Sequence, residues 1–358
     1  MTGSGPLGGV KVLEFEGKGA APFAARLLAD LGAAVTAVAR PRAGVVHERL
    51  LGDDDNPLRR GKTVIRLNLK DTADIASALA LVRDADVVIE GFRPGVMERL
   101  GLGPAECAAA RPSVVYGRLS GWGQSGAQAV TAGHELNYLA LAGLLAPERP
   151  GEPPPRVPAT TLGDAGGAVT FALGLVAAVH SARATGRGCV VDAAMVDAAA
   201  QLGTIAQWMR ARGQMGGGAP SLFYDSPFYD TYRCADGGYV AVAALEPSFY
   251  RALLAGIGLG GIDVESQFDR ATWTATKSRL AAAFLTRSRD AWADVFAATD
   301  ACVTPVLTPV EAARHPANVA RDLFHTGADG TAYAALAPRF APLSGLDAFD
   351  KSVPIGKN

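Results

Sequence analysis

The stretch that most constrains the fold reads as strand, helix and strand in immediate succession near the amino terminus. Val10–Phe15 is a short β-type run, and Ala20–Leu31 has the apolar spacing of a helix that stops at Gly32. Ala34–Ala39 is a second β-type run. This order implies a parallel sheet, because a helix must carry the chain back between parallel strands. A nucleotide-like ligand is then expected at the carboxyl ends of the strands.

The turn after the first run argues against NAD. It contains Gly17-Lys18-Gly19 but lacks the full G-x-G-x-x-G fingerprint. The second run is followed by Arg40, where an NAD site would carry an acid to bind the ribose hydroxyls. Because an arginine suits a phosphate on the ribose, NADP and the 3′-phosphate of coenzyme A both fit.

Other cations lie at the ends of neighbouring predicted strands. The run Arg59–Lys62 (RRGK) leads into the predicted strand Thr63–Leu69, and Arg93 closes the predicted strand Ala85–Phe92. Basic side chains at the ends of successive strands can surround a phosphorylated tail. For each cation taken singly, a solvated surface charge is the alternative.

The rest of the chain is expected to complete this domain and to add a smaller one. Helices are predicted at 71–82, 98–110 and 166–184, and a strand at 113–119. A hairpin at 226–242, helices at 247–256, 279–285 and 289–299, and a strand at 303–307 follow. We therefore expect a Rossmann-like α/β domain over 1–212, a linker over 213–225, a small α+β domain over 226–321, and a segment over 322–358 that returns to the large domain.

Bulk composition favours a small ligand. Among 358 residues, 34 Lys and Arg stand against 35 Asp and Glu, so no overall charge favours nucleic acid or an anionic membrane surface. Four scattered cysteines without a C-x-x-C argue against a metal site or a disulfide framework. No signal-peptide pattern is seen, and the most apolar run, 165–179, is shorter than the roughly 20 residues that span a bilayer. We expect a cytoplasmic protein in which this run is a buried helix.

The candidate chemistry lies in two glycine-flanked segments. His134 follows Gly133, and Asp164 lies between Gly163 and the pair Gly166-Gly167. Glycines let a substrate approach the backbone closely, so the two side chains can act as an acid and a base on opposite sides of one carbon. An N-cap for the following helix is a second role open to Asp164.

Seven short motifs, in this order along nearly the whole chain, resemble the α-methylacyl-CoA racemase branch of the family III (CaiB/BaiF-type) CoA-transferase superfamily. They are Gly5–Glu14 (GPLGGVKVLE), Leu28–Ala33 (LADLGA), Glu90–Val96 (EGFRPGV), Gly121–Gln124 (GWGQ), Gly133–Tyr138 (GHELNY), Val190–Asp197 (VVDAAMVD) and Asp300–Leu307 (DACVTPVL).

The resemblance implies reversible proton transfer at the α-carbon of a 2-methylacyl-CoA thioester, through an enolate and without a metal or a cofactor beyond the CoA of the substrate. His134 and Asp164 would be the two bases, and Glu246 would orient His134 from the partner subunit of an interlocked homodimer. Backbone N–H groups near Gly166-Gly167 are expected to stabilise the enolate. The other residues expected in the site are the pocket residues Asn137 and Tyr138 and the CoA-binding residues Arg40, Arg60, Lys62, Leu69 and Arg93.

Three departures from the family pattern leave alternatives open. Glu135 stands where the family usually has aspartate, which is the acyl-anhydride nucleophile in the transferase branch; a CoA transferase using Glu135 is therefore the runner-up. Glu16 and Lys18 stand where small or apolar residues usually lie near the acyl chain. They either form an ion pair with each other or reshape the pocket. In the second case, Lys18 recognises a polar acyl group, or the proton-transfer site has been turned to a different acyl substrate. A non-catalytic acyl-CoA-binding protein is the alternative from another class.

Overall fold

The computed structural model describes residues 5–41, 56–149, 151–216, 218, 220–327 and 330–340. The chain divides into two compact units: the first is Met1–Ala146, Pro155–Gly203 and Leu336–Asn358, and the second is Pro147–Pro154 and Thr204–Ala335. The predicted large domain runs to residue 212, whereas helix α9 (Thr204–Ala211) falls in the second unit, where Arg210 forms an ion pair with Glu148. Residues 213–225 and 322–335 also belong to the second unit, and 341–358 lie outside the described part.

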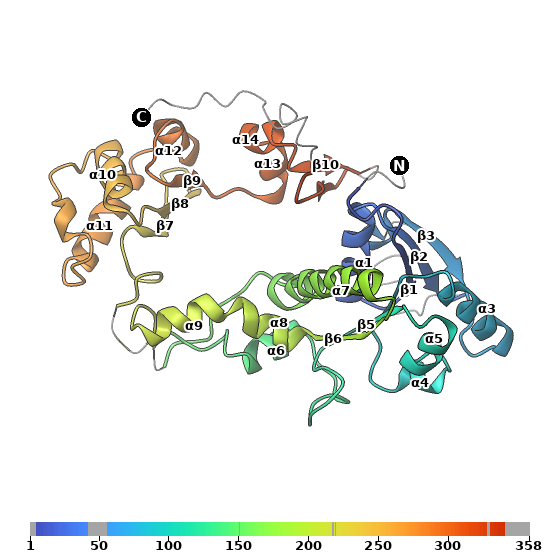
Figure 1. The fold of residues 1–358 in the computed structure, drawn as a ribbon. Coiled ribbons are helices and arrows are strands. Elements are labelled where there is room, and N and C mark those ends of the chain that lie inside the picture. The colour runs from blue at the N-terminus through green and yellow to red at the C-terminus, as the bar shows by residue number, and fades with distance from the viewer. Residues whose placement is uncertain are drawn as a thin grey trace. The chain divides into compact units, whose positions relative to one another are not determined.

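The first unit is built on a six-stranded parallel sheet with the strand order β3-β2-β1-β4-β5-β6 (Figure 1). On one side of β1, Lys11 is in register with Ala34, and on the other side Val12 is in register with Val87. The strands are β1 (Lys11–Phe15), β2 (Ala34–Ala39), β3 (Lys62–Arg66), β4 (Val87–Glu90), β5 (Val115–Ser120) and β6 (Val190–Ala194). This is the order of a doubly wound fold, so the predicted Rossmann-like class is confirmed. β6 is not among the predicted strands.

Helices cover both faces of the sheet. Successive strand residues point to opposite faces, so apolar strands present an apolar surface on each side for helices to bury. Val12 and Ile89 belong to the core on the side of α1 and α7, which lie side by side (Figure 1). Leu13 and Val88 belong to the core on the side of α3 and α5. The four helices are α1 (Ala20–Asp30), α3 (Thr72–Val82), α5 (Pro104–Ala110) and α7 (Gly166–Thr185). The four inner strands β1, β2, β4 and β5 are therefore buried on both faces, as is usual for a parallel sheet, whereas the edge strands β3 and β6 are partly exposed.

Helix α7 packs one side against the sheet. With the turn before it, α7 spans Thr161–Thr185 and is long and apolar enough to cross a membrane by length and composition alone. Phe171 and Leu175 on α7 are fully buried over Gly117 of β5, where a Cβ atom would lie 2.6 Å from each side chain. One buried side on the sheet is typical of a helix in the core of a folded domain.

The other helices of this unit are short. The single helix predicted at 98–110 is wrong, because Gly101 adopts φ 69° and Pro104 starts a new helix after Gly103. Asp71 is the N-cap of α3, since its side chain accepts a hydrogen bond from Ala73 N at 2.8 Å. The remaining elements are α4 (Val96–Arg99), α6 (Glu135–Leu141), α8 (Met195–Leu202), the 3₁₀ turn η1 (Pro57–Arg59) and the π-helical turn η2 (Thr161–Ala165).

The second unit is a small α+β domain with its own core. Its three-stranded sheet has the antiparallel order β7-β8-β9, and the predicted hairpin is confirmed by the pairing of Tyr229 with Ala243. The helix predicted at 279–285 begins earlier, at Trp273, because Thr276 continues the buried spacing of Trp273 and Leu280. The elements are β7 (Tyr229–Arg233), β8 (Tyr239–Ala243), β9 (Val303–Pro305), β10 (Phe324–Thr326), β11 (Ala332–Ala334), α10 (Pro247–Gly256), α11 (Trp273–Phe284), α12 (Arg289–Phe296), α13 (Pro309–Arg314), α14 (Pro316–Ala320) and the 3₁₀ turn η3 (Val264–Ser266).

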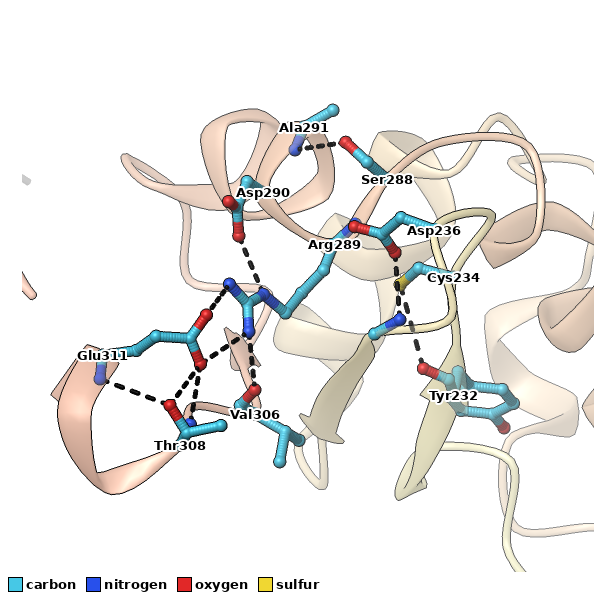
Figure 2. A network of polar contacts seen from close by, with 11 residues as sticks. Tyr232, Cys234, Asp236, Ser288, Arg289, Asp290, Ala291, Val306, Thr308 and Glu311 are labelled. Atoms are coloured by element: carbon cyan, nitrogen blue, oxygen red, sulfur yellow. Dashed lines mark hydrogen bonds and ion pairs between the residues drawn. The ribbon is translucent and has the colours of Figure 1, made fainter.

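A polar network joins three segments of the second unit at Arg289 (Figure 2). The Arg289 guanidinium donates to Glu311 Oε1 at 2.7 Å and to Val306 O at 3.2 Å. Glu311 in turn accepts from the backbone and the hydroxyl of Thr308, which caps α13. These bonds hold the pKa of Glu311 near 2, well below its ordinary value of 4.5.

Candidate active site

The strand order places a crevice at the carboxyl ends of β1 and β4. β2 and β3 lie on one side of β1, and β4, β5 and β6 lie on the other, so the chain leaves β1 in opposite directions. Ligands of open α/β sheets bind at such a switch point. Two hollows open there in the described part of the first unit. One, of about 250 Å³, is lined by the loops after β1, β4, β5 and β6, and the other, of about 440 Å³, by the ends of β1, β2, β3 and β4.

Glu90 and Arg118 support the first hollow and are not among the predicted site residues. Glu90 ends β4 and is 1% exposed; its carboxylate accepts from Phe92 N at 2.7 Å and from Arg118 Nε at 2.8 Å. Arg118 also donates to Glu98 at 2.7 Å. The Glu90 carboxylate thus holds the loop after β4 that lines the hollow. A charged residue inside each of two apolar strands is the sequence signal that would have indicated them.

His134 lines the first hollow from the start of α6. Its backbone N–H donates to Asn137 Oδ1 at 3.0 Å, and the Asn137 N–H donates back to the His134 carbonyl at 2.8 Å. Asn137 is expected in the pocket but is not among the residues that line the hollow. In this structure its side chain holds the backbone of His134.

Tyr138 lines the same hollow, as expected, one helical turn after His134. Its ring meets Trp122 edge to face, with the centroids 4.8 Å apart, and its hydroxyl donates to the carbonyl of Gly133. A Cβ on Gly133 would lie 2.8 Å from the Trp122 ring, so only glycine fits before His134. Burial, with a contribution from the charge of Asp164, raises the pKa of Tyr138 to about 12. The hydroxyl therefore stays protonated and acts as a hydrogen-bond donor.

Asp164 lies inside the π-helical turn η2, directly before α7. It is not the N-cap of α7, because the chain is already helical at this residue. Burial raises the pKa of Asp164 most, the charge of Glu135 raises it further, and His134 lowers it. The Gly166 N–H donates to the carbonyl oxygens of Thr161 and Gly163 within the turn, so this one N–H group is not free for an enolate.

Glu135, the first residue of α6, is 7% exposed and touches the turn that carries Asp164. Its Oε1 accepts from Leu162 N at 3.1 Å. Glu135 and Asp164 interact electrostatically, but neither is among the described residues that line the first hollow, whereas His134 is. Two predicted carboxylates and the predicted histidine are therefore brought together from segments that are far apart in sequence.

The second hollow contains part of the predicted CoA-binding set. Arg40 and Leu69 line it together with Asn68 and Phe92. Arg93 instead lines the first hollow, with Lys18. Phe92 lines both hollows, so they adjoin at this side chain. A long ligand can thus extend from Arg40 past Phe92 towards His134.

Lys62 and Arg60 are engaged elsewhere. The ammonium of Lys62 lies 2.5 Å from Glu14 Oε2 and donates to Pro22 O at 2.8 Å, and the side chains of Lys62 and Glu14 are each 1% exposed. Burial raises the pKa of Glu14 to about 7 and lowers that of Lys62. Arg60 lies 3.5 Å from Asp30 on α1. The Lys62 ammonium cannot meet a phosphate from solution in this arrangement, because it is buried.

The side chains of Glu16 and Lys18 line different hollows. Glu16 accepts two hydrogen bonds from the Arg59 guanidinium, at 2.6 and 2.8 Å, and lines the second hollow. Lys18 lines the first hollow and has no ion-pair partner among the described residues. The expectation of a Glu16–Lys18 ion pair is therefore wrong, and the cation of Lys18 remains available beside His134.

Glu246 belongs to the second unit, where it is exposed at the start of α10. Its predicted hydrogen bond to His134 stays a prediction.

The thiol of Cys302 lies near Glu246. Burial and the charges of Glu246 and Asp300 raise the pKa of Cys302. Over the described ranges, no group of three or more His, Cys, Asp or Glu residues is placed to hold a metal ion.

These features are typical of an α/β enzyme that uses acid–base chemistry. They are the doubly wound sheet, the two adjoining hollows at its switch point, and a histidine that interacts with an aspartate of raised pKa. Residues 7–349 match the model of CoA-transferase family III, and the chain belongs to that family.

Relatives of known name include both isomerases and transferases. The chain is 40% identical over 348 residues to the alpha-methylacyl-CoA racemase of Homo sapiens, covering 94% of this chain and 86% of the relative. It is 32% identical over 338 residues to the acetyl-CoA:oxalate CoA-transferase of Acetobacter aceti, covering 89% and 85%. Among solved structures, Rv3272 from Mycobacterium tuberculosis has a TM-score of 0.79 at 26% identity, covering 95% of this chain and 94% of that one.

Proposed function

We propose that this protein is a racemase or epimerase that interconverts (2R)- and (2S)-2-methylacyl-CoA thioesters. The observation that carries the proposal is the electrostatic interaction of His134 with Asp164, an aspartate whose pKa is raised by burial, in a chain 40% identical to a racemase of that name. One residue removes the α-proton and the other returns a proton to the opposite face. A raised pKa lets Asp164 hold the proton that it must deliver.

His134 is placed for the removal step, because it lines the hollow where a thioester would lie. Removal of the proton leaves its electron pair on the α-carbon, from where it spreads to the thioester oxygen as an enolate. The carbon–hydrogen bond re-forms with the proton from Asp164, so His134 ends protonated and Asp164 ionised. In the reverse direction the two residues exchange roles.

The CoA part of the substrate is proposed to extend along the two hollows. Arg40 and Leu69 would bind it at the second hollow and Arg93 at the first, with the guanidinium groups facing phosphates. The CoA belongs to the substrate, and no further cofactor is proposed.

A cytoplasmic homodimer completes the proposal. On α6 and α7, four large apolar side chains are more than half exposed, which supports a protein partner for these two helices. They are Leu136 (63%), Leu141 (65%), Val169 (56%) and Leu173 (71%). In the dimer, Glu246 of the partner subunit would hydrogen-bond His134. Light scattering should give twice the mass of the chain, and a monomeric mass would contradict the dimer.

The test of the reaction is NMR of α-hydrogen exchange in D2O with each enantiomer of a 2-methylacyl-CoA. The parent should exchange the α-hydrogen and form both enantiomers, and both His134→Ala and Asp164→Ala should lose the reaction. A parent that binds the ester but exchanges no α-hydrogen would refute the proposal.

Acyl transfer through Glu135 is the second candidate, because a CoA-transferase is also among the relatives. It predicts that CoA moves to a free acid and that hydroxylamine traps a covalent thioester of Glu135 with CoA, which leaves a hydroxamate on Glu135 and releases CoA. Acyl transfer would be excluded if the protein exchanges the α-hydrogen but shows neither of these two reactions.

A further inference from the structure

Glu135 is an acidic group beside His134 and Asp164 that the proposed racemisation does not use. One of its oxygens, Oε1, accepts from Leu162 N at 3.1 Å. The other, Oε2, is buried and has no hydrogen-bond donor in the described part of the chain. A buried carboxylate with a free oxygen costs folding free energy, so its presence calls for a physical reason.

The first reason lies in the turn that Glu135 contacts. Thr160 enters η2 with φ 59°, which is uncommon for a residue other than glycine, and Ala165 N donates to Thr160 O at 3.1 Å. Isolated π-helical turns are often found at functional sites, and such backbone persists only when its surroundings hold it. The Glu135 side chain also packs on Gly163, where a Cβ would lie 3.0 Å from Glu135 Cγ. Glu135 therefore contacts both residues that precede Asp164.

The second reason is charge. Burial and Glu135 both raise the pKa of Asp164, and His134 opposes them. The helices packed against η2 are α1, α6, α7 and α8. The other ionisable side chains on them are Arg26, Asp30, Tyr138, His180, Arg183 and Asp197. Arg26 and Asp30 pair with each other at 3.6 Å, and Asp197 is exposed. The charge of Glu135 is thus the electrostatic influence that favours a proton on Asp164.

We propose that Glu135 is a positioning residue: its Oε1 holds the turn that carries Asp164, and its buried carboxylate places a negative charge beside the Asp164 carboxyl. This inference rests on the proposed racemase function. It assigns Glu135 a different role from that of a nucleophile, since Oε1 is already hydrogen-bonded and the side chain does not line the hollow.

Two substitutions separate the two roles. Glu135→Gln removes the charge but keeps an oxygen that can accept from Leu162 N, whereas Glu135→Asp keeps the charge on a side chain one methylene shorter. The first readout is the titration of the Asp164 carboxyl carbon by NMR, assigned with Asp164→Asn. The second is the pH profile of kcat/KM for α-hydrogen exchange. Because the active enzyme carries one proton shared by His134 and Asp164, both enantiomers should give the same bell-shaped profile.

Glu135→Gln should move the Asp164 titration, and the limb of the profile to which Asp164 contributes, to lower pH without changing KM. Glu135→Asp should leave that limb in place but lower kcat, because the turn is held less well. An unchanged Asp164 titration in Glu135→Gln would overturn the proposal, as would a hydroxamate formed on Glu135 by hydroxylamine.

The NMR titration needs no turnover, so it separates this inference from the proposed function. A parent protein without α-hydrogen exchange refutes the racemase, while the Asp164 titration still decides the role of Glu135. If Glu135→Gln does not fold, the parent still tests the proposal, because an Asp164 that titrates like an exposed aspartate would overturn it.

Discussion

Substituting Gly117 by alanine should displace helix α7 and, with it, the turn that carries Asp164. The new Cβ would lie 2.6 Å from Leu175 Cδ2 and from Phe171 Cζ, where an ordinary contact is 3.4 to 4 Å. The helix must therefore move by about 1 Å, or its side chains must leave their rotamers, at a cost of about 1–3 kcal/mol. Alanine in a strand is more favourable than glycine by about 0.5–1 kcal/mol, so the net loss lies between about 0 and 2.5 kcal/mol, with about 1 kcal/mol as its central value.

The effect on the reaction should be larger than the effect on stability. Because Asp164 lies directly before α7, a shift of this size misplaces the carboxyl and should lower the rate of α-hydrogen exchange by about 10- to 100-fold. Stability is measured by urea unfolding and the rate by NMR. Adding Phe171→Leu should recover part of both losses, since it removes the ring atoms that the Cβ meets.

The matched control is Gly261→Ala in the second unit, where a Cβ meets no atom within 4 Å. It should change neither stability nor rate. A Gly117→Ala protein that is as stable and as active as the parent would refute the argument, because the contact between α7 and β5 would then tolerate an extra methyl group.

Three other substitutions test charges in the two units. Lys18→Ile should lower the ratio of the rate with a carboxylate-bearing acyl-CoA to the rate with an apolar branched acyl-CoA by about 10- to 100-fold, because a hydrogen bond to a charged group contributes that much. Rates equal to those of the parent on both substrates would contradict a role of Lys18 in acyl recognition. Arg118→Met should cost about 3–5 kcal/mol in urea unfolding, because it leaves Glu90 buried without its cation, and adding Glu90→Gln should recover part of this loss. Since Arg289 lowers the pKa of Glu311 from 4.5 to about 2, that carboxylate stabilises the fold above pH 4.5, and its contribution is lost as the pH falls from 4.5 to about 2. Glu311→Gln should abolish this part of the pH dependence, and unfolding curves that fall equally in both proteins would contradict it.

Much of the fold could be predicted because its signals are local. The strand at 34–39 has the predicted bounds, and so has the helix at 247–256, which begins after Glu246 with a proline at its first position. The errors are also local in origin. The run at 98–110 has a helical composition, but Gly101 with positive φ and Pro104 divide it.

The candidate site could be predicted only in part, because its geometry depends on contacts between distant segments. Glycines beside His134 and Asp164 mark the two segments in the sequence. The bond from Leu162 N to Glu135, which places the Asp164 turn, joins residues 27 positions apart and has no periodic signal. Helical and strand periodicities report burial along one element and carry no information about such pairs.

The sequence by itself determines the doubly wound class, the family and the segments that carry His134, Asp164 and Glu135, since these depend on residue type and order along the chain. Tertiary structure alone decides which charges pair. The run 59–62 shows this: its cations are alike in sequence, yet Arg59 binds Glu16 at the rim, and Lys62 is buried against Glu14. The physical reason is that an ion pair forms where packing brings two charges together and excludes water, and packing depends on the whole sheet and the helices that cover it.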